Sequence, residues 1–185
     1  MTLSDGSKFS FSSGASQYRG GTGPLHVSRA PASHPLHQAF MAAGVEAGYP
    51  FTEDMNGYQQ EGVGRYDRTI LDGKRCSAAK AYLKPALQRN NLNIETKAMV
   101  GRVLFENNKA VGVEYRIGNT TKCVRASKEV ILCGGVINSP QLLMLSGVGD
   151  AVELKVLGIP TVAHLPGMGG NLQDHVQVYV QYVSI

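Results

Sequence analysis

The sequence predicts an α/β fold with an α+β portion, and two patterns support this prediction. A short apolar run with a β-branched start, Val130–Leu132, is followed by two glycines and a compact apolar helix, Gln141–Ser146. The order of strand, tight turn and helix is typical of a buried strand in an α/β sheet. From Leu92 onward the apolar residues recur instead with a period of two, which indicates an antiparallel meander. The chain is therefore expected to contain both kinds of sheet.

Two helices are predicted in the first half of the chain. Residues 1–24 are rich in serine and glycine and show no periodicity, so they are expected to form loop. Residues 34–48 carry apolar side chains at helical spacing, and Gly48 would end that helix. Residues 77–89 form a second helical pattern, which Pro85 is expected to kink or split.

The second half of the chain is expected to be rich in strands. The period-two pattern predicts strands at residues 93–96, 99–105, 109–116 and 121–126, with turns at residues 106–109 and 118–119. Beyond the central helix, an edge strand is predicted at residues 161–165 and a further strand at residues 176–183. The meander would deliver the chain into the buried strand at Val130.

The turn between that strand and its helix is the most informative local feature. Gly134 and Gly135 would make a sharp turn, Ser139 would cap the helix, Pro140 would be its first residue, and Gly147 would end it. Bare backbone at such a turn can approach a ligand closely. The unpaired N–H groups and the positive end of the helix dipole favour negative charge. These residues therefore predict a site for an anionic cofactor.

Composition limits the class of protein. A length of 185 residues fits about one domain, and contents of 43% hydrophobic and 17% charged residues are those of a globular protein. The net charge of +4 comes from 18 basic and 14 acidic residues that are interspersed. No run of Lys and Arg resembles a nucleic-acid patch, so we expect no nucleic-acid partner.

Cysteine usage and apolar runs give further limits. Cys76, Cys123 and Cys133 are an odd number without close pairing, which argues against a disulfide framework and favours a reducing compartment. No apolar run approaches the roughly 18 residues needed to span a bilayer. The first residues lack an apolar signal core, and their basic residues are too sparse for a transit peptide.

Two motifs have simpler explanations than the functional ones they suggest. Gly147-Val148-Gly149 follows a helix rather than a strand, and Val152 stands where a dinucleotide fingerprint needs glycine, so we interpret it as a helix end. His34 and His37 have the spacing of a metal pair. With Pro35 between them and no third ligand nearby, they are expected to mark the start of a helix, and no metal site is predicted.

The segment Asn171–His175 (NLQDH) leaves two interpretations open. It follows the glycine-rich stretch Pro166–Gly170. Its Asn and Asp side chains could simply hold turns of a loop. The same amide, acid and imidazole groups could instead form a polar cluster near a cofactor.

Longer strings in the chain resemble a known family. Residues 134–149, GGVINSPQLLMLSGVG, are similar to the second signature of the glucose–methanol–choline (GMC) oxidoreductases, except that Val136 stands where a small residue is usual. NLQDH is similar to the family segment that follows this signature. Several other strings resemble the choline-oxidising members: YRGGTGPLHVSR, TEDMNGYQQEG, GKRCSAAKAYLKPAL and RVLFENNKAVGVEY. The resemblance covers about residues 14–185.

The resemblance implies FAD as the cofactor and an FAD-binding Rossmann-like region. In the family, the residue that matches Val100 contacts FAD through its backbone, and Gly134 and Gly135 match the turn that passes near the cofactor. The family oxidises alcohols by removing a proton while a hydride leaves for the flavin. Its catalytic histidine and its phosphate-binding glycine loop have no counterpart in this chain. We therefore expect a fragment that has no catalytic base and is inactive alone.

The resemblance also implies a small-molecule alcohol substrate, choline or a similar one, but it does not identify the electron acceptor. His175 matches a motif at the edge of the substrate cavity. Choline-oxidising members carry a glutamate facing the trimethylammonium group where this chain has Gln177, and often a tryptophan where it has Cys76. Another alcohol, such as a sugar or an aliphatic one, is therefore a second hypothesis. An inactive truncated flavin-domain scaffold is a third.

Family likeness also suggests an organisation and a location. Residues 1–13 would be an atypical N-terminus, and residues 14–90 would hold substrate-domain and lid segments. Residues 91–158 would form the FAD-binding region, and residues 159–185 would begin the substrate-domain sheet. The resemblance alone implies a mitochondrial location, since no targeting segment is visible.

Overall fold

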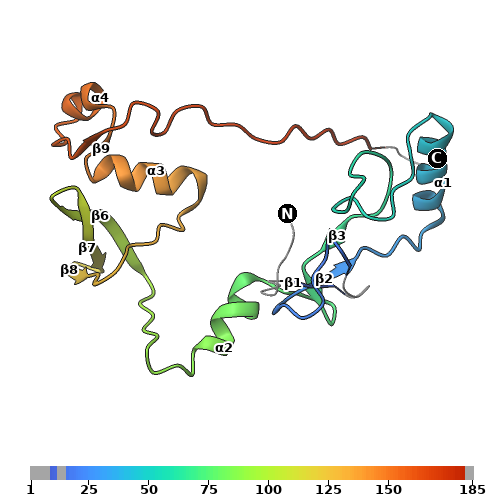
Figure 1. Cartoon of the computed structure of the whole chain (residues 1–185), viewed down its shortest axis with the longest axis horizontal. Helices are drawn as coiled ribbons and strands as arrows, with labels where there is room; N and C mark the ends of the chain where they lie inside the picture. The colour runs from blue at the N-terminus through green and yellow to red at the C-terminus, as the bar shows by residue number, and fades with distance from the viewer. Residues whose placement is uncertain (1–8, 12–15, 182–185) are drawn as a thin grey trace. The chain divides into compact units, whose positions relative to one another are not determined.

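The computed structural model describes residues 9–11 and 16–181. The chain divides into two compact units, Met1–Asn93 and Ile94–Ile185, and each is described by itself (Figure 1). The predicted strand over residues 182–183 and the loop predicted over residues 1–8 and 12–15 lie outside the described residues.

Unit 1 contains short strands that the sequence patterns did not predict. Strand β2 (Leu25–Arg29) pairs in parallel with β1 (Phe9–Phe11) and antiparallel with β3 (Asp67–Arg68). The loop prediction was therefore wrong for Phe9–Phe11, which finds a backbone partner far along the chain. A hairpin of β4 (Ile70–Leu71) and β5 (Lys74–Arg75) follows. These strands are two to five residues long, too short to show a periodic pattern.

Helix α1 (Pro35–Glu46) confirms the first helical prediction. The Nδ1 atom of His34 accepts a hydrogen bond from the Leu36 N–H at 3.2 Å, so this histidine caps the helix. Gly48 follows the end of α1 with φ of +91°, as the helix-stop prediction requires. His34 and His37 stack edge to face. Among the described residues, no group of three His, Cys, Asp or Glu side chains is placed to hold a metal ion.

The second helical pattern is split, as its proline predicted. A π-helical turn, η1 (Ala79–Leu83), passes into the short helix α2 (Lys84–Ala86). Pro85 lies at this change of helix type. Proline has no backbone N–H, so it cannot donate the hydrogen bond of a regular helix. The Ser77 hydroxyl accepts a hydrogen bond from the Lys80 N–H at 3.3 Å, at the start of this split helix.

A cluster of charged side chains joins distant parts of unit 1. Arg19 is 6% exposed and forms ion pairs with both Asp54 and Asp67. Arg29 contacts Asp67 at 3.4 Å on one side and the exposed Glu53 at 3.4 Å on the other. The hydrogen bond from Arg19 lowers the pKa of the Asp54 carboxyl below its usual value. The cluster therefore holds its loops in place with charge-assisted bonds.

Unit 2 contains the predicted meander. Strands β6 (Ala98–Glu106), β7 (Lys109–Ile117) and β8 (Thr120–Arg125) form an antiparallel sheet in the order β6-β7-β8. Asn107 and Asn108, both at positive φ, make the first turn, and Gly118 with φ of +56° makes the second. The additional strand predicted at residues 93–96 was wrong. No described strand pairs with it, and Lys97 with φ of +56° breaks the extended backbone.

Helix α3 (Gly135–Leu145) packs against β6 but begins earlier than predicted. Its N-cap is Gly134, so Ser139 is not the cap and Pro140 lies inside the helix rather than at its first position. Pro140 is the sixth helical residue, where its missing N–H removes a single hydrogen bond near the helix start. Gly147 follows the end of α3 with φ of +89°, which confirms the helix-stop interpretation of the Gly-Val-Gly motif.

The buried strand predicted at Val130–Leu132 was wrong. These residues have no regular structure, no described strand lies beside them, and the Ile131 side chain is 72% exposed. Residues 176–181 are likewise irregular, and Val176 is 95% exposed. In both segments the apolar pattern is present, but the described residues provide no neighbouring strand to pair with it.

The core of unit 2 lies where α3 ends. Strand β9 (Val148–Gly149) pairs in parallel with β10 (Ala163–His164), and helix α4 (Ala151–Val156) follows β9. The short β10 partly confirms the edge strand predicted at residues 161–165. Residues 146–149 are all buried, and Leu154 and Val103 are 0% and 4% exposed. No helix in the described part of the chain has the length and apolar content to cross a membrane.

The charged cluster predicts a pH-dependent stability for unit 1. Because its folded-state pKa is lowered, Asp54 contributes stability above its unfolded pKa of about 3.9, and this contribution is lost as the pH falls through the lower folded value. Asp54→Asn should cost roughly 1 kcal/mol at pH 7, a modest figure because the carboxyl is partly exposed. Urea unfolding at pH 7, 5 and 3 should show the difference shrinking below about pH 4.

Glu53→Gln is the matched control. Glu53 is an exposed acid in the same cluster, with a side chain that is 78% exposed. Its removal should change the unfolding free energy by less than about 0.5 kcal/mol at each pH. Equal effects of the two substitutions would show that the Arg19 contact does not stabilise the unit.

The close approach at Gly147 predicts a second stability effect. A Cβ atom at this position would lie 2.4 Å from the Pro160 carbonyl oxygen, on a backbone with φ of +89°. Gly147→Ala should therefore lower the free energy of unfolding by roughly 3 kcal/mol. Gly158 has a similar φ of +71° but no atom within 4 Å of a Cβ, so Gly158→Ala should cost only about 1 kcal/mol. Urea unfolding of both variants isolates the contribution of the contact.

Candidate functional site

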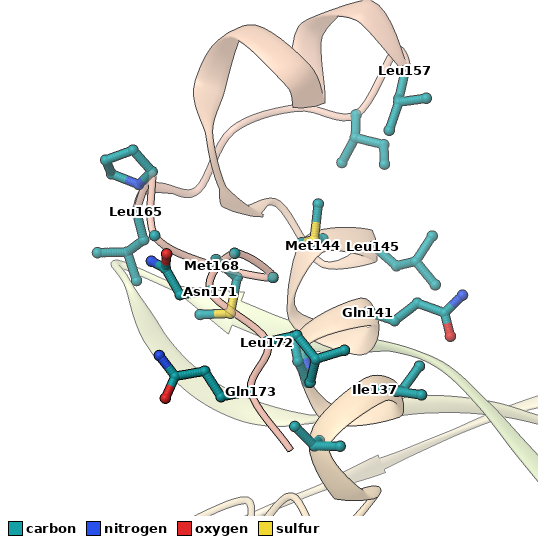
Figure 2. A pocket seen from close by; sticks show the side chains of 17 residues that line it. Ile137, Gln141, Met144, Leu145, Leu157, Leu165, Met168, Asn171, Leu172 and Gln173 are labelled. Carbon is teal, nitrogen blue, oxygen red and sulfur yellow. The ribbon is translucent and has the colours of Figure 1, made fainter. Parts of the chain in front are cut away.

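Helix α3 and the loop that follows β10 form the walls of an open pocket in unit 2. Figure 2 shows this loop running alongside the helix. The pocket has a volume of about 1040 Å³. Its lining comprises Val136, Ile137, Pro140, Gln141, Met144 and Leu145 of α3, Leu157 and Ile159 after α4, and residues 165–173.

The lining is apolar and carries no charged side chain. Met144 and Met168 contribute polarizable thioethers, which adapt to the shape of a ligand. The only polar side chains that line the pocket are the amides of Gln141, Asn171 and Gln173. An apolar cavity with a few amides suits a flat, largely neutral ring with polar groups at its edge.

Backbone contacts hold the loop against the helix. The Leu165 N–H donates to the Gly149 carbonyl at 2.8 Å, which continues the β9–β10 pairing into the loop. Gly169 has φ of +78°, and a Cβ there would lie 3.1 Å from Sδ of Met144. Glycine at this position therefore allows both the turn and the close approach to α3.

Gly134 and Gly135 lie at the entrance to helix α3, directly before the first pocket residue, Val136. Both glycines are exposed, and they do not themselves line the pocket. Gly135 has φ of +83° and open space where a Cβ would be. The first backbone N–H groups of α3 are also without helical acceptors. Main chain is thus accessible beside the pocket, and an anion or a polar ring edge could approach it.

Val100 lies on β6, the strand against which α3 packs. It pairs with Tyr115 across the sheet, and the register then shifts by one residue at Gly101, which forms a β-bulge. Val100 is 38% exposed. Desolvation, and then the nearby Glu95, raises the pKa of the Tyr115 hydroxyl above its usual value.

His175 and Gln177 lie beyond the last pocket residue, Gln173, on the irregular segment. Both are exposed, and the bonds around them are local. The His175 N–H donates to Asp174 at 2.8 Å, and the Tyr179 hydroxyl donates to Oε1 of Gln177 at 2.8 Å. The structure does not bring these two residues into the pocket beside Gly134 and Gly135, so their roles remain predictions.

The sequence patterns missed most of the pocket. Met144 and Leu172 lie within the strings that resemble the family, residues 134–149 and NLQDH, but no site role was predicted for them or for Met168. Asn171 and Gln173 belong to the polar cluster for which two interpretations were open, and both line the pocket. That cluster was the one local signal that pointed to this loop.

Comparison with known proteins agrees with the resemblance noted in the sequence. Residues 6–177 match the family model described as GMC oxidoreductase. The human protein named "Choline dehydrogenase, mitochondrial" is 63% identical over 168 residues, which are 91% of this chain and 28% of the relative. "Oxygen-dependent choline dehydrogenase" of Staphylococcus saprophyticus is 52% identical over 166 residues, or 90% of this chain and 30% of the relative. The chain thus spans less than a third of the length of these relatives.

Solved structures give the same result. Pyridoxine 4-oxidase from Mesorbium loti is similar with a TM-score of 0.80 and 32% identity, over 86% of this chain and 32% of the other. An FAD-dependent oxidoreductase from Chaetomium thermophilum has a TM-score of 0.80 and 29% identity, over 87% of this chain and 30% of the other. With a family model that covers residues 6–177 and relatives of such high identity, the chain belongs to the GMC oxidoreductase family.

Proposed function

We propose that this chain is the flavin-facing part of an FAD-dependent alcohol oxidoreductase that acts on choline or a similar alcohol. One observation carries the proposal. The diglycine start of α3 exposes bare main chain directly beside an uncharged pocket large enough for a ring system. Among the relatives, choline dehydrogenases are 50–63% identical over about nine-tenths of this chain. We extend their activity to this chain as a proposal, because the chain spans only part of their length.

The residues of the pocket fit one part of FAD better than the other. The isoalloxazine ring is flat and mostly apolar, and its edge carries hydrogen-bonding groups. An apolar pocket with the amides of Gln141, Asn171 and Gln173 matches that chemistry. The diphosphate is anionic, and no Lys or Arg lines the pocket. We therefore assign the ring, and not the diphosphate, to this pocket.

Each predicted site residue has a defined role in this proposal. FAD, when bound, would accept the hydride that leaves the alcohol carbon. Gly134 and Gly135 would hold the ring edge through backbone N–H groups, and Val100 would contact it through its own backbone. His175 and Gln177 would border the substrate. These residues bind and orient, and we assign no catalytic base within this chain.

The nature of Gln177 supports a second candidate substrate. Its carboxamide oxygen accepts a hydrogen bond from Tyr179, which orients the oxygen, but the group carries no charge. A neutral amide attracts a trimethylammonium group less than a carboxylate does. An uncharged alcohol is therefore the alternative to choline, and a scaffold that binds flavin without turnover is the third possibility.

A mitochondrial location is part of the same proposal. The human and mouse relatives, 63% and 62% identical, are both named as mitochondrial. Bacterial relatives at about 50–53% identity show that the likeness alone does not fix the compartment. Imaging of the tagged protein in cells would test the location, and a purely cytosolic signal would contradict it.

A flavin titration tests the cofactor proposal. Adding FAD or FMN to the ¹⁵N-labelled chain should shift the backbone amide signals of Val100, Gly134 and Gly135, because the ring is assigned to this region. Saturation should give a dissociation constant of about 1 mM or lower. ADP is the control, since it lacks the ring and should leave these three amides unchanged. Equal shifts with ADP, or none with FAD, would contradict the proposal.

A charge substitution tests the substrate. Gln177→Glu, made in a chimera that joins this chain to the remaining segments of the human relative, restores a carboxylate at this position. KM for choline should fall about tenfold, because a partly screened ion pair contributes roughly 1.4 kcal/mol. KM for 3,3-dimethylbutan-1-ol, the neutral isostere of choline, should change less than about twofold. Equal changes for both alcohols would show that residue 177 does not face the cation.

A further inference from the structure

One backbone amide at the edge of the meander has an unusual partner. Among the strands that the structure describes, β6 pairs only with β7, so alternate N–H groups of β6 point away from the sheet. The Val103 N–H is one of these groups, and Val103 is 4% exposed. It donates a hydrogen bond to Oγ of Ser146 at 2.8 Å. A side chain from the end of α3 thus replaces the missing neighbouring strand.

The same hydroxyl bonds in the other direction. Ser146 Oγ–H donates to the Leu142 carbonyl at 2.5 Å, one turn back in α3. Ser146 is the C-cap of the helix and is 8% exposed. Its hydroxyl therefore bridges the last turn of α3 to β6 inside the core. The bond from the Val103 N–H is buried and the bond to the Leu142 carbonyl is partly buried, so water cannot easily replace the first if the hydroxyl is removed.

The place of this bridge along β6 gives it a further consequence. The register shift at Gly101 lies between Val100 and Val103. A Cβ at Gly101 would meet nothing closer than an oxygen at 3.9 Å, so close packing at that residue does not fix the bulge. Gly101 itself has no partner on β7, although β6 is paired before it at Val100 and after it at Arg102, so a contact from the open edge adds to these pairs in fixing the strand. Ser146 holds it at Val103, on the side of the bulge away from Val100.

We propose that Ser146 is a positioning residue for the flavin. Its hydroxyl fixes the register of β6 at the bulge, and it thereby holds the backbone of Val100 at a set place relative to the start of α3. This inference rests on the proposed function, which places Val100 and the Gly134–Gly135 turn on the same cofactor. Ser146 itself touches no cofactor and lies 43 positions from Val103 in the sequence.

Substitutions at Ser146 in the full 185-residue chain test the inference. Ser146→Ala should weaken FAD binding in the NMR titration about tenfold, as expected from the loss of one buried hydrogen bond. The Val103 amide should exchange with solvent at least about tenfold faster, and the FAD-induced shift at Val100 should fall. The shift at Gly135 should fall less, because α3 keeps its own start. Ser146→Thr retains the hydroxyl and should restore FAD affinity to within about threefold.

Two further variants separate this role from a general loss of stability. Ser139→Ala removes a hydroxyl from the same helix, and the Ser139 side chain has no hydrogen-bond partner among the described residues. It should leave FAD affinity and Val103 exchange unchanged. Ser146→Cys fills nearly the same volume with a much weaker hydrogen-bonding group. If Ser146→Ala does not fold, Ser146→Cys carries the test, and it should show the same loss at Val100.

The possible outcomes distinguish this inference from the proposed function. In one outcome the wild type binds FAD, and Ser146→Ala or Ser146→Cys leaves both the FAD affinity and the Val100 shift unchanged. This result overturns the positioning role and leaves the proposed function intact. Wild type that shows no FAD response overturns the proposed function, and the positioning role falls with it. Equal losses at Val100 and Gly135, without rescue by threonine, would show a structural role only and would also overturn the inference.

Discussion

A buried amide at the open edge of a sheet needs an acceptor, and unit 2 is arranged around this requirement at Val103. Ser146 provides the acceptor, and because Ser146 also ends α3, one hydrogen bond fixes both the strand and the helix terminus. The next residue, Gly147, turns the chain toward the segment before β10, and its carbonyl accepts the Val162 N–H at 2.7 Å. Meander, helix and pocket loop are therefore joined at one buried junction, and the pocket walls take their positions from it.

Elements that depend on local signals could be predicted from the sequence. The period-two pattern and the Asn-Asn and Gly-Asn turns predicted β6, β7 and β8, since a hairpin is specified by neighbouring residues. Gly48 and Gly147 marked helix ends because a left-handed backbone suits glycine. Strand pairing over long separations could not be predicted. Val130–Leu132 has the composition of a strand, but composition does not provide a neighbour, and among the described residues none is present.

The candidate site shows the same division. Its motif residues, Gly134 and Gly135, could be named because a long string resembles a family signature. Most of the pocket walls could not, since Met144 and Leu172 become neighbours only when the loop after β10 folds against α3. The Arg19 cluster was also unpredictable: the two acids that pair with Arg19 are 35 and 48 residues from it, and single charged residues give no periodic signal. Resemblance supplied what local physics did not, because it carries information about long-range contacts.

Because no charged side chain lines the pocket, the pocket suits the ring of a flavin dinucleotide and not its diphosphate. A buried diphosphate needs cations or many backbone N–H groups, and an apolar pocket without Lys or Arg would make its desolvation costly. A neutral ring has no such cost, and it gains from contact with thioethers and aliphatic side chains. Discrimination at this pocket should therefore depend on shape and on a few amide and backbone contacts. Small displacements of main chain, such as a one-residue shift of β6 at Gly101, would then alter ring binding more than changes in surface charge would.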